Sequence, residues 1–350
     1  MNLIYKLAGV AFIILSLVVG WFWQSLNSFS SFPIRLASES VTFNVVPGSS
    51  IAKIAYQLER DSIISDASRF RWMVKLDGGD KSIKAGEYEL KQGMTPKDLL
   101  VLFVSGKVKQ YAFTIVEGWS FKQLLEALVS NTHIEHTLKG KSEAEVMTAL
   151  GYEGQHYEGR FLPDTYHFPS GSTDVAFLKR AYQAMVRVLE EEWSMREKDL
   201  PYKNSYDALI MASIVEKETG IASERKEIAG VFVRRLEKRM RLQTDPTVIY
   251  GMGDEYQGNL RKKDLIKDTP YNTYRRNGLP PTPIALPGRA AINATLHPAK
   301  TNALYFVAKG DGSHYFSETV TEHNKAVRKY QIKQRKADYR SSPNKAAAEQ

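Results

Sequence analysis

The longest apolar stretch of the chain lies at its amino terminus. Leu7–Trp23 reads LAGVAFIILSLVVGWFW, and no charged residue occurs between Lys6 and Arg35. A helix rises about 1.5 Å per residue, so this run spans most of a bilayer core. Bulky residues follow it, whereas a cleaved signal peptide needs small residues before the cut. We therefore expect residues 1–26 to be a short stub and an uncleaved transmembrane anchor, in preference to a signal peptide or a buried globular helix.

The charges beside this run predict its orientation. Lys6 and the amino group lie on the short side, and basic residues favour the cytoplasmic side of a membrane. The stub is therefore expected in the cytoplasm and the bulk of the protein outside it. A nucleic-acid partner becomes a poor candidate, because an exported domain rarely meets DNA.

A short polar stretch at 27–40 is expected to be a linker, and alternating apolar residues then predict a small domain at 41–116. We expect strands at 41–46, 85–90 and 110–116, a helix at about 51–60 capped by Ser49 or Ser50, and a helix that begins at the Thr95–Asp98 capping pattern and ends at Gly106. Residues 41–107 resemble the LysM-like modules that hold N-acetylated glycans. A small α+β domain without a ligand is the alternative.

Helical and strand patterns alternate irregularly through residues 117–330, which predicts a larger mixed α+β domain. We expect helices at 120–129, at 173–197 after a Ser172 or Thr173 cap, and at 206–220, where Gly220 ends the helix. A hairpin at 304–316 and a helix from about Thr321 complete the domain. The expected fold class is α+β: a transmembrane helix, a small LysM-like α+β module and a larger mixed domain, followed by a basic tail at 331–350.

Composition narrows the class of protein. The chain has 350 residues, no cysteine, 43% hydrophobic residues and a formal net charge of +9. This apolar content excludes a largely disordered chain, and the lack of cysteine excludes disulfides, thiolate metal sites and thiol nucleophiles. Two thirds of the net charge falls in residues 325–350. We interpret that end as a solvated segment, with attraction to anionic lipid or polymer as the alternative.

One carboxylate stands out in the helix predicted at 206–220. At 100° per residue, Glu218 falls on the same apolar stripe as Met211 and Ile214, whereas Glu216 points about 160° away. A carboxyl held against apolar surface keeps its proton more readily and can donate it to a leaving group. The alternative is a structural residue at a helix end, or an ion-pair partner of Arg225.

The segments downstream are rich in Gln, Asn, Thr, Tyr, Pro and Gly, which suits loops that contact sugars. They cover 241–247, 250–253, 269–274 and 278–288, and each alone is better explained as an ordinary turn. The Gly251–Gly253 pair lacks the strand and helix of a dinucleotide site and is interpreted as a turn. His133 and His136 share a helical spacing without a third ligand, so we interpret them as a surface pair and expect no metal.

Several motifs resemble one family in both order and spacing. They are Ala212–Thr219 (ASIVEKET), Ala222–Arg225 (ASER), Arg241–Tyr250 (RLQTDPTVIY), Tyr271–Tyr274 (YNTY), Gly278–Pro281 (GLPP), the upstream Glu158–Tyr166 segment and His297–Lys300 (HPAK). The chain is thereby similar to the membrane-anchored endolytic murein transglycosylases, the MltG or YceG-like family. The resemblance implies a bacterial enzyme anchored in the inner membrane by residues 7–23, with its catalytic part in the periplasm.

The same resemblance implies a reaction and its residues. Glu218 matches the family's catalytic acid, which would cut the β-1,4 bond between N-acetylmuramic acid and N-acetylglucosamine without water, metal or cofactor. We expect a glycan cleft lined by Gln243, Thr244, Asp245, Tyr271, Asn272 and Tyr274. The partners implied are peptidoglycan strands and peptidoglycan synthases of the same membrane. A non-catalytic glycan-binding scaffold and a hydrolytic muramidase remain rival functions.

Overall fold

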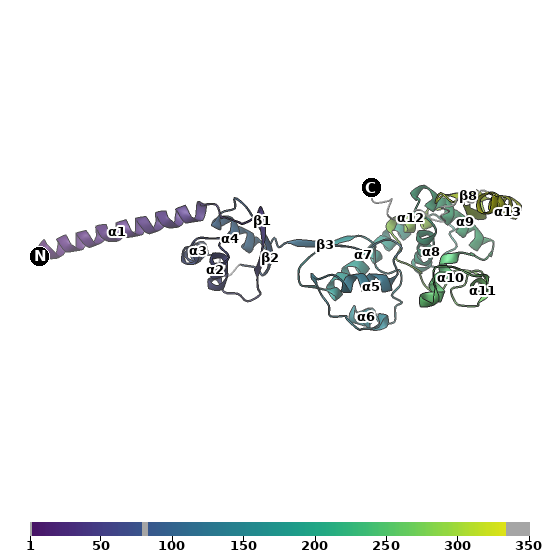
Figure 1. Ribbon diagram of the computed structural model, residues 1–350, viewed down its shortest axis with the longest axis horizontal. Coiled ribbons are helices and arrows are strands. Elements are labelled where there is room, and N and C mark those ends of the chain that lie inside the picture. Colours follow the sequence, from purple (N-terminus) through teal and green to yellow (C-terminus); the bar gives the residue numbers. More distant parts are fainter. Residues whose placement is uncertain (1, 79–82, 334–350) are drawn as a thin grey trace. The chain divides into compact units, whose positions relative to one another are not determined.

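The computed structural model describes residues 2–78 and 83–333, which divide into two units (Figure 1). The first unit holds the described residues up to 111 together with 167–171. The second holds 112–166 and the described residues from 172 onward. Most of the tail predicted at 331–350, from residue 334 on, lies outside the described residues. The mixture of helices and short strands agrees with the expected α+β class.

The amino-terminal helix α1 (Asn2–Ser31) is 30 residues long, or about 45 Å. Its most apolar window has a mean hydropathy of 2.3 and is fully exposed. Among the described residues it is the one helix long and apolar enough to cross a membrane. Residues 27–31 were expected to be linker but continue the helix, because Leu26 and Phe29 are buried where α1 contacts two helices of the first unit.

The rest of the first unit follows the predicted pattern with one added helix. Its elements are β1 (Ser40–Val45), α2 (Ile51–Arg60), α3 (Ala67–Leu76), β2 (Gly86–Lys91) and α4 (Pro96–Ser105). Strand β1 pairs antiparallel with β2, so that Phe43 lies opposite Tyr88. Helix α3 was not expected, since basic residues interrupt its apolar positions.

Local signals fix the ends of the helices in this unit. The Ser50 hydroxyl accepts a hydrogen bond from the Lys53 amide and caps α2. Thr95 and Asp98 form the predicted capping box of α4, and Gly106 ends the helix with a φ of 70°. That left-handed conformation is cheap only for glycine, so the stop was readable from sequence. The buried rings of Phe43 and Tyr88 pack on Phe103 of α4 and form the centre of the core.

The second unit is built mainly of helices, with strands that pair in twos. Its helices are α5 (Phe121–Val129), α6 (Glu143–Ala149), α7 (Asp174–Ser194), α8 (Ser205–Glu218), η2 (Ala222–Glu224), α9 (Arg225–Glu237), α10 (Asp245–Met252), η3 (Gly253–Glu255), α11 (Lys262–Ile266), α12 (Arg289–Leu296), α13 (Val320–Val327) and η4 (Arg328–Lys333). Its strands are β4 (Ile134–Glu135), β6 (Ser172–Thr173), β7 (Tyr305–Ala308) and β8 (His314–Ser317). The division between the units falls within β3 (Gln110–Thr114) and β5 (Thr165–Pro169). Among described residues the sheets are β1–β2, β3–β5, β4–β6 and β7–β8.

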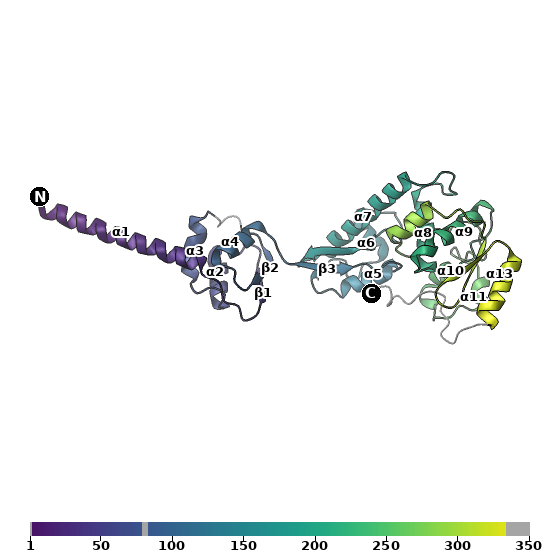
Figure 2. The same cartoon turned by 90° about the horizontal axis from the view of Figure 1, so that it is seen from above.

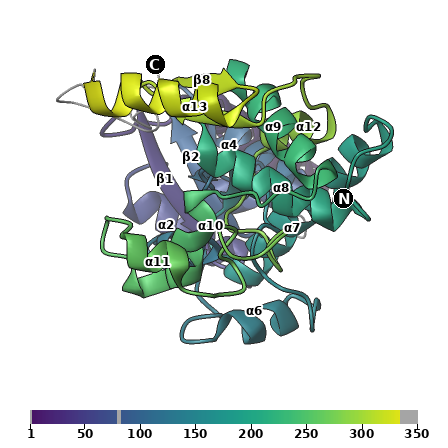
Figure 3. The same cartoon turned by 90° about the vertical axis from the view of Figure 1, so that its right-hand side faces the viewer.

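Helix α8 occupies the middle of the second unit. It contacts α7, α9, α10 and α12 (Figure 3). Helix α12 packs in turn on α7 and α9 (Figure 2). Helix α9 approaches the chain after α12 so closely that a Cβ on Gly230 would lie 2.5 Å from the Ala299 carbonyl oxygen. Eight successive residues of α8, from Ala208 to Val215, are buried, which makes this helix a rigid support for whatever follows its last turn.

Several sequence-based expectations for this unit need correction. Helix α8 ends at Glu218, two residues early, because Thr219 turns extended and its hydroxyl accepts from the Ile221 amide. The segment expected as a loop at 241–253 contains α10, a helix too short to show a clear period. His133 and His136 flank strand β4 instead of sharing a helix face, and both are partly buried. The Thr173 cap and the β7–β8 hairpin are confirmed.

Candidate active site

Glu218 is the last residue of the buried helix α8. Asn204 caps the start of the helix, since its side chain accepts a hydrogen bond from the Asp207 amide. Met211 and Ile214, which share a stripe with Glu218, are fully buried. The side chain of Glu218 is only partly buried, so its carboxyl lies where the apolar core meets the surface. Helix packing therefore fixes the position of this carboxyl.

Burial moves the titration of the Glu218 carboxyl toward neutral pH. Burial is the main reason that its pKa rises to about 7. The Thr244 hydroxyl donates a hydrogen bond to the carboxylate and lowers the pKa, while the charge of Asp245 raises it and that of Arg235 lowers it. A group with a pKa near the working pH can both give and take a proton, which suits general acid–base chemistry.

A network of buried threonines holds Thr244 in place. Its amide donates to the Thr273 hydroxyl at 3.1 Å, and its carbonyl accepts from the Thr247 hydroxyl at 2.8 Å. The hydroxyls of Thr247 and Thr273 lie 2.9 Å apart. Gln243, just before Thr244, is exposed with a left-handed φ of 53°, and its amide donates to the Thr273 carbonyl. The start of α10 and the 269–274 loop are thus joined directly beside Glu218.

Asp245 and Tyr274 form a second link between the same two segments. The Tyr274 hydroxyl donates to the Asp245 carboxylate at 2.6 Å, and burial raises the pKa of Tyr274. Asp245 itself is exposed at the first turn of α10. Of the six predicted cleft residues, Thr244 contacts Glu218 directly, while Gln243, Asp245 and Tyr274 lie on the segments that hold Thr244.

Tyr271 and Asn272 form hydrogen bonds that hold the loop beside the site in place. The Asn272 amide group donates to the carbonyls of Asp264, Leu265 and Lys267 at 3.3, 3.0 and 2.6 Å, so this buried side chain shapes the α11 turn. The Tyr271 hydroxyl lies 2.8 Å from that of Thr282, and its ring packs edge-on against Tyr250. The Asn272 amide group therefore donates to these carbonyls within the protein, whereas Tyr271 is partly exposed.

Within residues 2–78 and 83–333, no group of three or more His, Asp or Glu side chains is arranged to hold a metal ion.

The sequence of the chain matches one protein family over most of its length. The profile of the YceG-like family covers residues 43–329. The chain belongs to the YceG-like family. An endolytic murein transglycosylase of Bacillus subtilis is 34% identical over 320 residues, which cover 85% of this chain and 87% of that protein.

Two further relatives extend the comparison. An endolytic murein transglycosylase of Streptococcus pneumoniae is 27% identical, and the match covers 92% of this chain but 64% of that longer protein. The crystal structure of a yceG-like protein from Listeria monocytogenes matches with a TM-score of 0.53 and 32% identity, covering 82% of this chain and 98% of that one. The fold described above is therefore similar, over 82% of the chain, to one seen in a crystal structure.

This YceG-like chain also holds a fully buried carboxyl, that of Glu158, which the sequence did not reveal as such. Glu158 is 1% exposed. It accepts one hydrogen bond from the Phe121 amide at 2.9 Å and another from the Tyr250 hydroxyl. Burial raises the pKa of Glu158 to about 7. Glu158 lies between α6 and β5, outside any helix or strand, so no periodic pattern marked it as buried. Its bond to Tyr250 links it to the ring that packs on Tyr271.

The structure of this YceG-like protein argues against one alternative weighed for Glu218, the ion pair with Arg225. Arg225, considered as its ion-pair partner, instead lies 3.7 Å from Glu117. Glu216 points away, as the helical period predicts, and its carboxylate accepts from the Gly288 amide at 3.1 Å. The buried Arg235 donates to the carbonyls that precede Gln243, those of Arg241 and Leu242, and so fixes the chain that enters the site.

Proposed function

We propose that this chain is an endolytic lytic transglycosylase of peptidoglycan, with Glu218 as its acid and base. The observation that carries the proposal is a carboxyl at the end of a rigid buried helix, with a pKa of about 7 and a hydroxyl partner in Thr244. The relatives from Bacillus subtilis and Streptococcus pneumoniae, both endolytic murein transglycosylases, support the same reaction class.

The proposed reaction uses one carboxyl twice. Protonated Glu218 gives its proton to the glycosidic oxygen that leaves with N-acetylglucosamine, and the C1–O bond of N-acetylmuramic acid breaks with oxocarbenium character. The resulting carboxylate then takes the proton of the C6 hydroxyl on the same sugar, and that oxygen bonds to C1. The product is a 1,6-anhydro ring, no water is consumed, and Glu218 ends protonated as it began.

The environment of Glu218 suits both half-reactions. A pKa of about 7 leaves the carboxyl largely protonated at slightly acidic pH, yet keeps its conjugate base strong enough to accept a proton. The Thr244 hydroxyl can stabilise the carboxylate formed between the two steps. Since nucleophile and electrophile belong to one sugar, positioning supplies much of the rate. We assign that role to the exposed Gln243 and Asp245 and to the partly exposed Tyr271 and Tyr274; Asn272 shapes the loop that carries the two tyrosines.

The anchor and the small module complete the proposal. Residues 7–23 of α1 would hold the protein in the inner membrane, with the stub in the cytoplasm and both units in the periplasm, close to nascent strands and to peptidoglycan synthases. The LysM-like character of residues 41–107 stays a prediction; the β1–α2–α3–β2–α4 order is compatible with a small glycan-binding module.

Product analysis tests the function and separates it from its rivals. The full chain in detergent is incubated with purified, peptide-free glycan strands, and the new ends are identified by mass spectrometry. We expect anhydro ends, lighter by one water than reducing ends. Only reducing ends would support a hydrolytic muramidase, and no cleavage at all would support a binding scaffold.

A pair of variants tests the assignment of Glu218. Glu218→Gln should lower the rate by a factor on the order of 10³, since general acid and general base are lost together. Glu216→Gln is the matched control on the same turn; it keeps an oxygen to accept from Gly288 and should retain activity. Equal activity of the two variants would contradict the assignment.

A further inference from the structure

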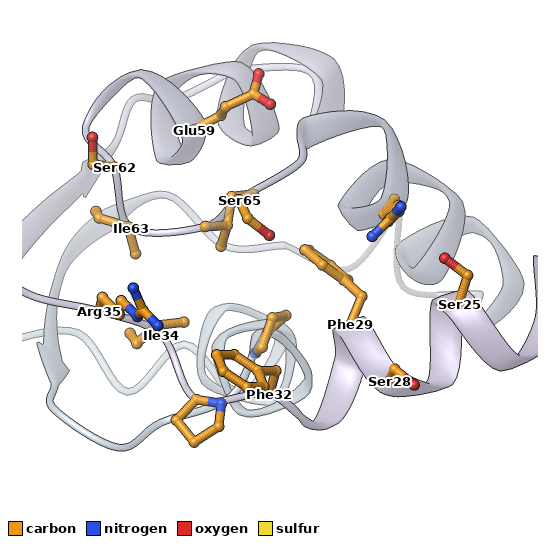
Figure 4. Close-up of a pocket in the computed structure, with 14 residues that line it drawn as sticks. Ser25, Ser28, Phe29, Phe32, Ile34, Arg35, Glu59, Ser62, Ile63 and Ser65 are labelled. Carbon is orange, nitrogen blue, oxygen red and sulfur yellow. The ribbon is translucent and has the colours of Figure 1, made fainter.

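A pocket of about 700 Å³ lies in the first unit, where α1 meets the loop between α2 and α3 (Figure 4). It contains none of the candidate catalytic residues. Phe29 of α1 and Phe32 just after the helix line it on one side, and Ile63 and Ser65 line it from the opposite loop. Apolar rings and several serine hydroxyls share its wall, so the pocket suits a ligand that is itself amphiphilic.

The distance of this pocket from the apolar run identifies the layer it would meet. Trp23 ends the run, and the pocket is lined by residues from Ser25 to Arg35. At 1.5 Å per helical residue, Ser25–Ser28 lie about 3–8 Å beyond Trp23. The polar headgroup layer of a bilayer extends about 5–8 Å beyond the hydrocarbon core on each side. If α1 spans the membrane as proposed, the mouth of the pocket is at headgroup level.

Tryptophan on α3 supports this placement independently. The ring of Trp72 packs edge-on against Phe22 of α1, with centroids 6.0 Å apart, and is 47% exposed. Trp21 and Trp23 are also exposed on α1. Exposed tryptophans at one level are typical of the membrane interface. The side of the first unit that carries α3 is therefore expected to rest on the lipid surface.

The charges around the pocket select the sign of the ligand. Arg35 is exposed and forms no ion pair among the residues that the structure describes. Arg69 pairs with Asp66 at 3.3 Å, and Glu59 accepts from the Ala67 amide at the start of α3. A guanidinium without a carboxylate partner, above an apolar floor, fits a phosphate group attached to a hydrocarbon chain.

We propose that this pocket binds an anionic glycerophospholipid drawn partly out of the leaflet that faces the first unit, with its phosphate on Arg35 and its upper acyl carbons against Phe29, Phe32 and Ile63. Phe29 lies about 9 Å beyond Trp23, so the lipid enters at the pocket mouth and extends past the headgroup layer. The proposal rests on the membrane anchoring described under the proposed function. It gives the anchor a second contact, which would hold the first unit against the bilayer and restrict how the unit tilts about the end of α1.

Lipid retention measured by native mass spectrometry tests the pocket. The full chain is delipidated in detergent and offered equal amounts of phosphatidylglycerol and phosphatidylcholine. We expect phosphatidylglycerol to be retained preferentially, and Arg35→Gln to reduce that preference about five-fold, the factor that one basic residue contributes near an anionic surface. Arg60→Gln is the matched control, since Arg60 pairs with Asp61 and does not line the pocket. Equal preference in both variants overturns the proposal.

Because the chain has no cysteine, a single introduced cysteine can be labelled selectively and gives a second readout of the pocket. The Ser65→Cys variant, labelled with a fluorophore, is reconstituted with phosphatidylglycerol that carries a headgroup spin label. We expect quenching that weakens when Arg35→Gln is added. Flotation of the same vesicles after a carbonate wash tests the anchor separately. Retained flotation without quenching overturns the pocket alone, whereas loss of flotation overturns the anchor and the pocket together.

Discussion

The pH dependence of cleavage should report the protonation of Glu218. With a pKa of about 7, the acid form falls to roughly a tenth of the total at pH 8 and to about a hundredth at pH 9. If the first step needs that proton, kcat/KM on peptide-free glycan should be level below pH 6 and fall about tenfold per pH unit above pH 8. End-group release at a fixed low substrate concentration measures this directly.

Substitutions at two neighbours of Glu218 should move the midpoint of the pH profile in opposite directions. Thr244→Val removes the hydroxyl that stabilises the carboxylate, so the pKa and the midpoint should rise, on the order of one pH unit. Asp245→Asn removes a nearby negative charge, so the midpoint should fall, by roughly a few tenths of a unit because Asp245 is exposed. The midpoint is independent of any loss of maximal rate.

The Glu216→Gln variant is the control for this series, since Glu216 points away from the site and should leave the midpoint unchanged. A profile that is flat from pH 6 to 9 would refute the acid role of Glu218. If the midpoint moves in the same direction in Thr244→Val and Asp245→Asn, the electrostatic explanation is refuted.

Three further changes address stability. Folding raises the pKa of Glu218 above the 4.5 of the unfolded chain, so the free energy of unfolding falls as pH rises from about 4.5 through about 7. In urea unfolding, Glu218→Gln should therefore be more stable than the parent by about 1–3 kcal/mol at pH 8 and equal to it near pH 4. Gly230→Ala places a Cβ 2.5 Å from the Ala299 oxygen and should cost about 1–3 kcal/mol, seen as a lower Tm. Asn272→Ala removes the donor of three carbonyls, so it should lower the free energy of unfolding by on the order of 1–3 kcal/mol and speed proteolysis at 262–267. The control Asn277→Ala, at an exposed position, should change neither the stability nor the proteolysis rate.

Features encoded within a few residues were predictable from the sequence. The capping box at Thr95 and the glycine stop at Gly106 are local, and both occur where expected. The helical period placed Glu218 on the buried stripe of α8 and Glu216 on the other side, because eight buried residues before them follow one regular helix. The length and lack of charge of the amino-terminal run likewise needed no tertiary information.

Features that depend on distant contacts were not predictable. The Thr244–Thr273 bond joins residues 29 positions apart, and Glu158 is buried by partners such as Phe121, 37 positions away. Neither contact leaves a periodic trace in the sequence. The early end of α8 was missed because Thr219, which ends the helix through its own hydroxyl, stands next to a glycine that is the commoner stop.

The place of Glu218 at the carboxyl end of α8 has an electrostatic consequence. The aligned peptide dipoles of a helix put roughly half a negative charge at its last turn. Because α8 ends at Glu218, the negative end of this dipole lies beside the carboxylate and disfavours its charge. In the reaction that we propose, this field would favour the protonated carboxyl before cleavage and the return of the proton to Glu218 when the anhydro ring closes. A carboxyl moved to the first turn of the same helix would experience the opposite field.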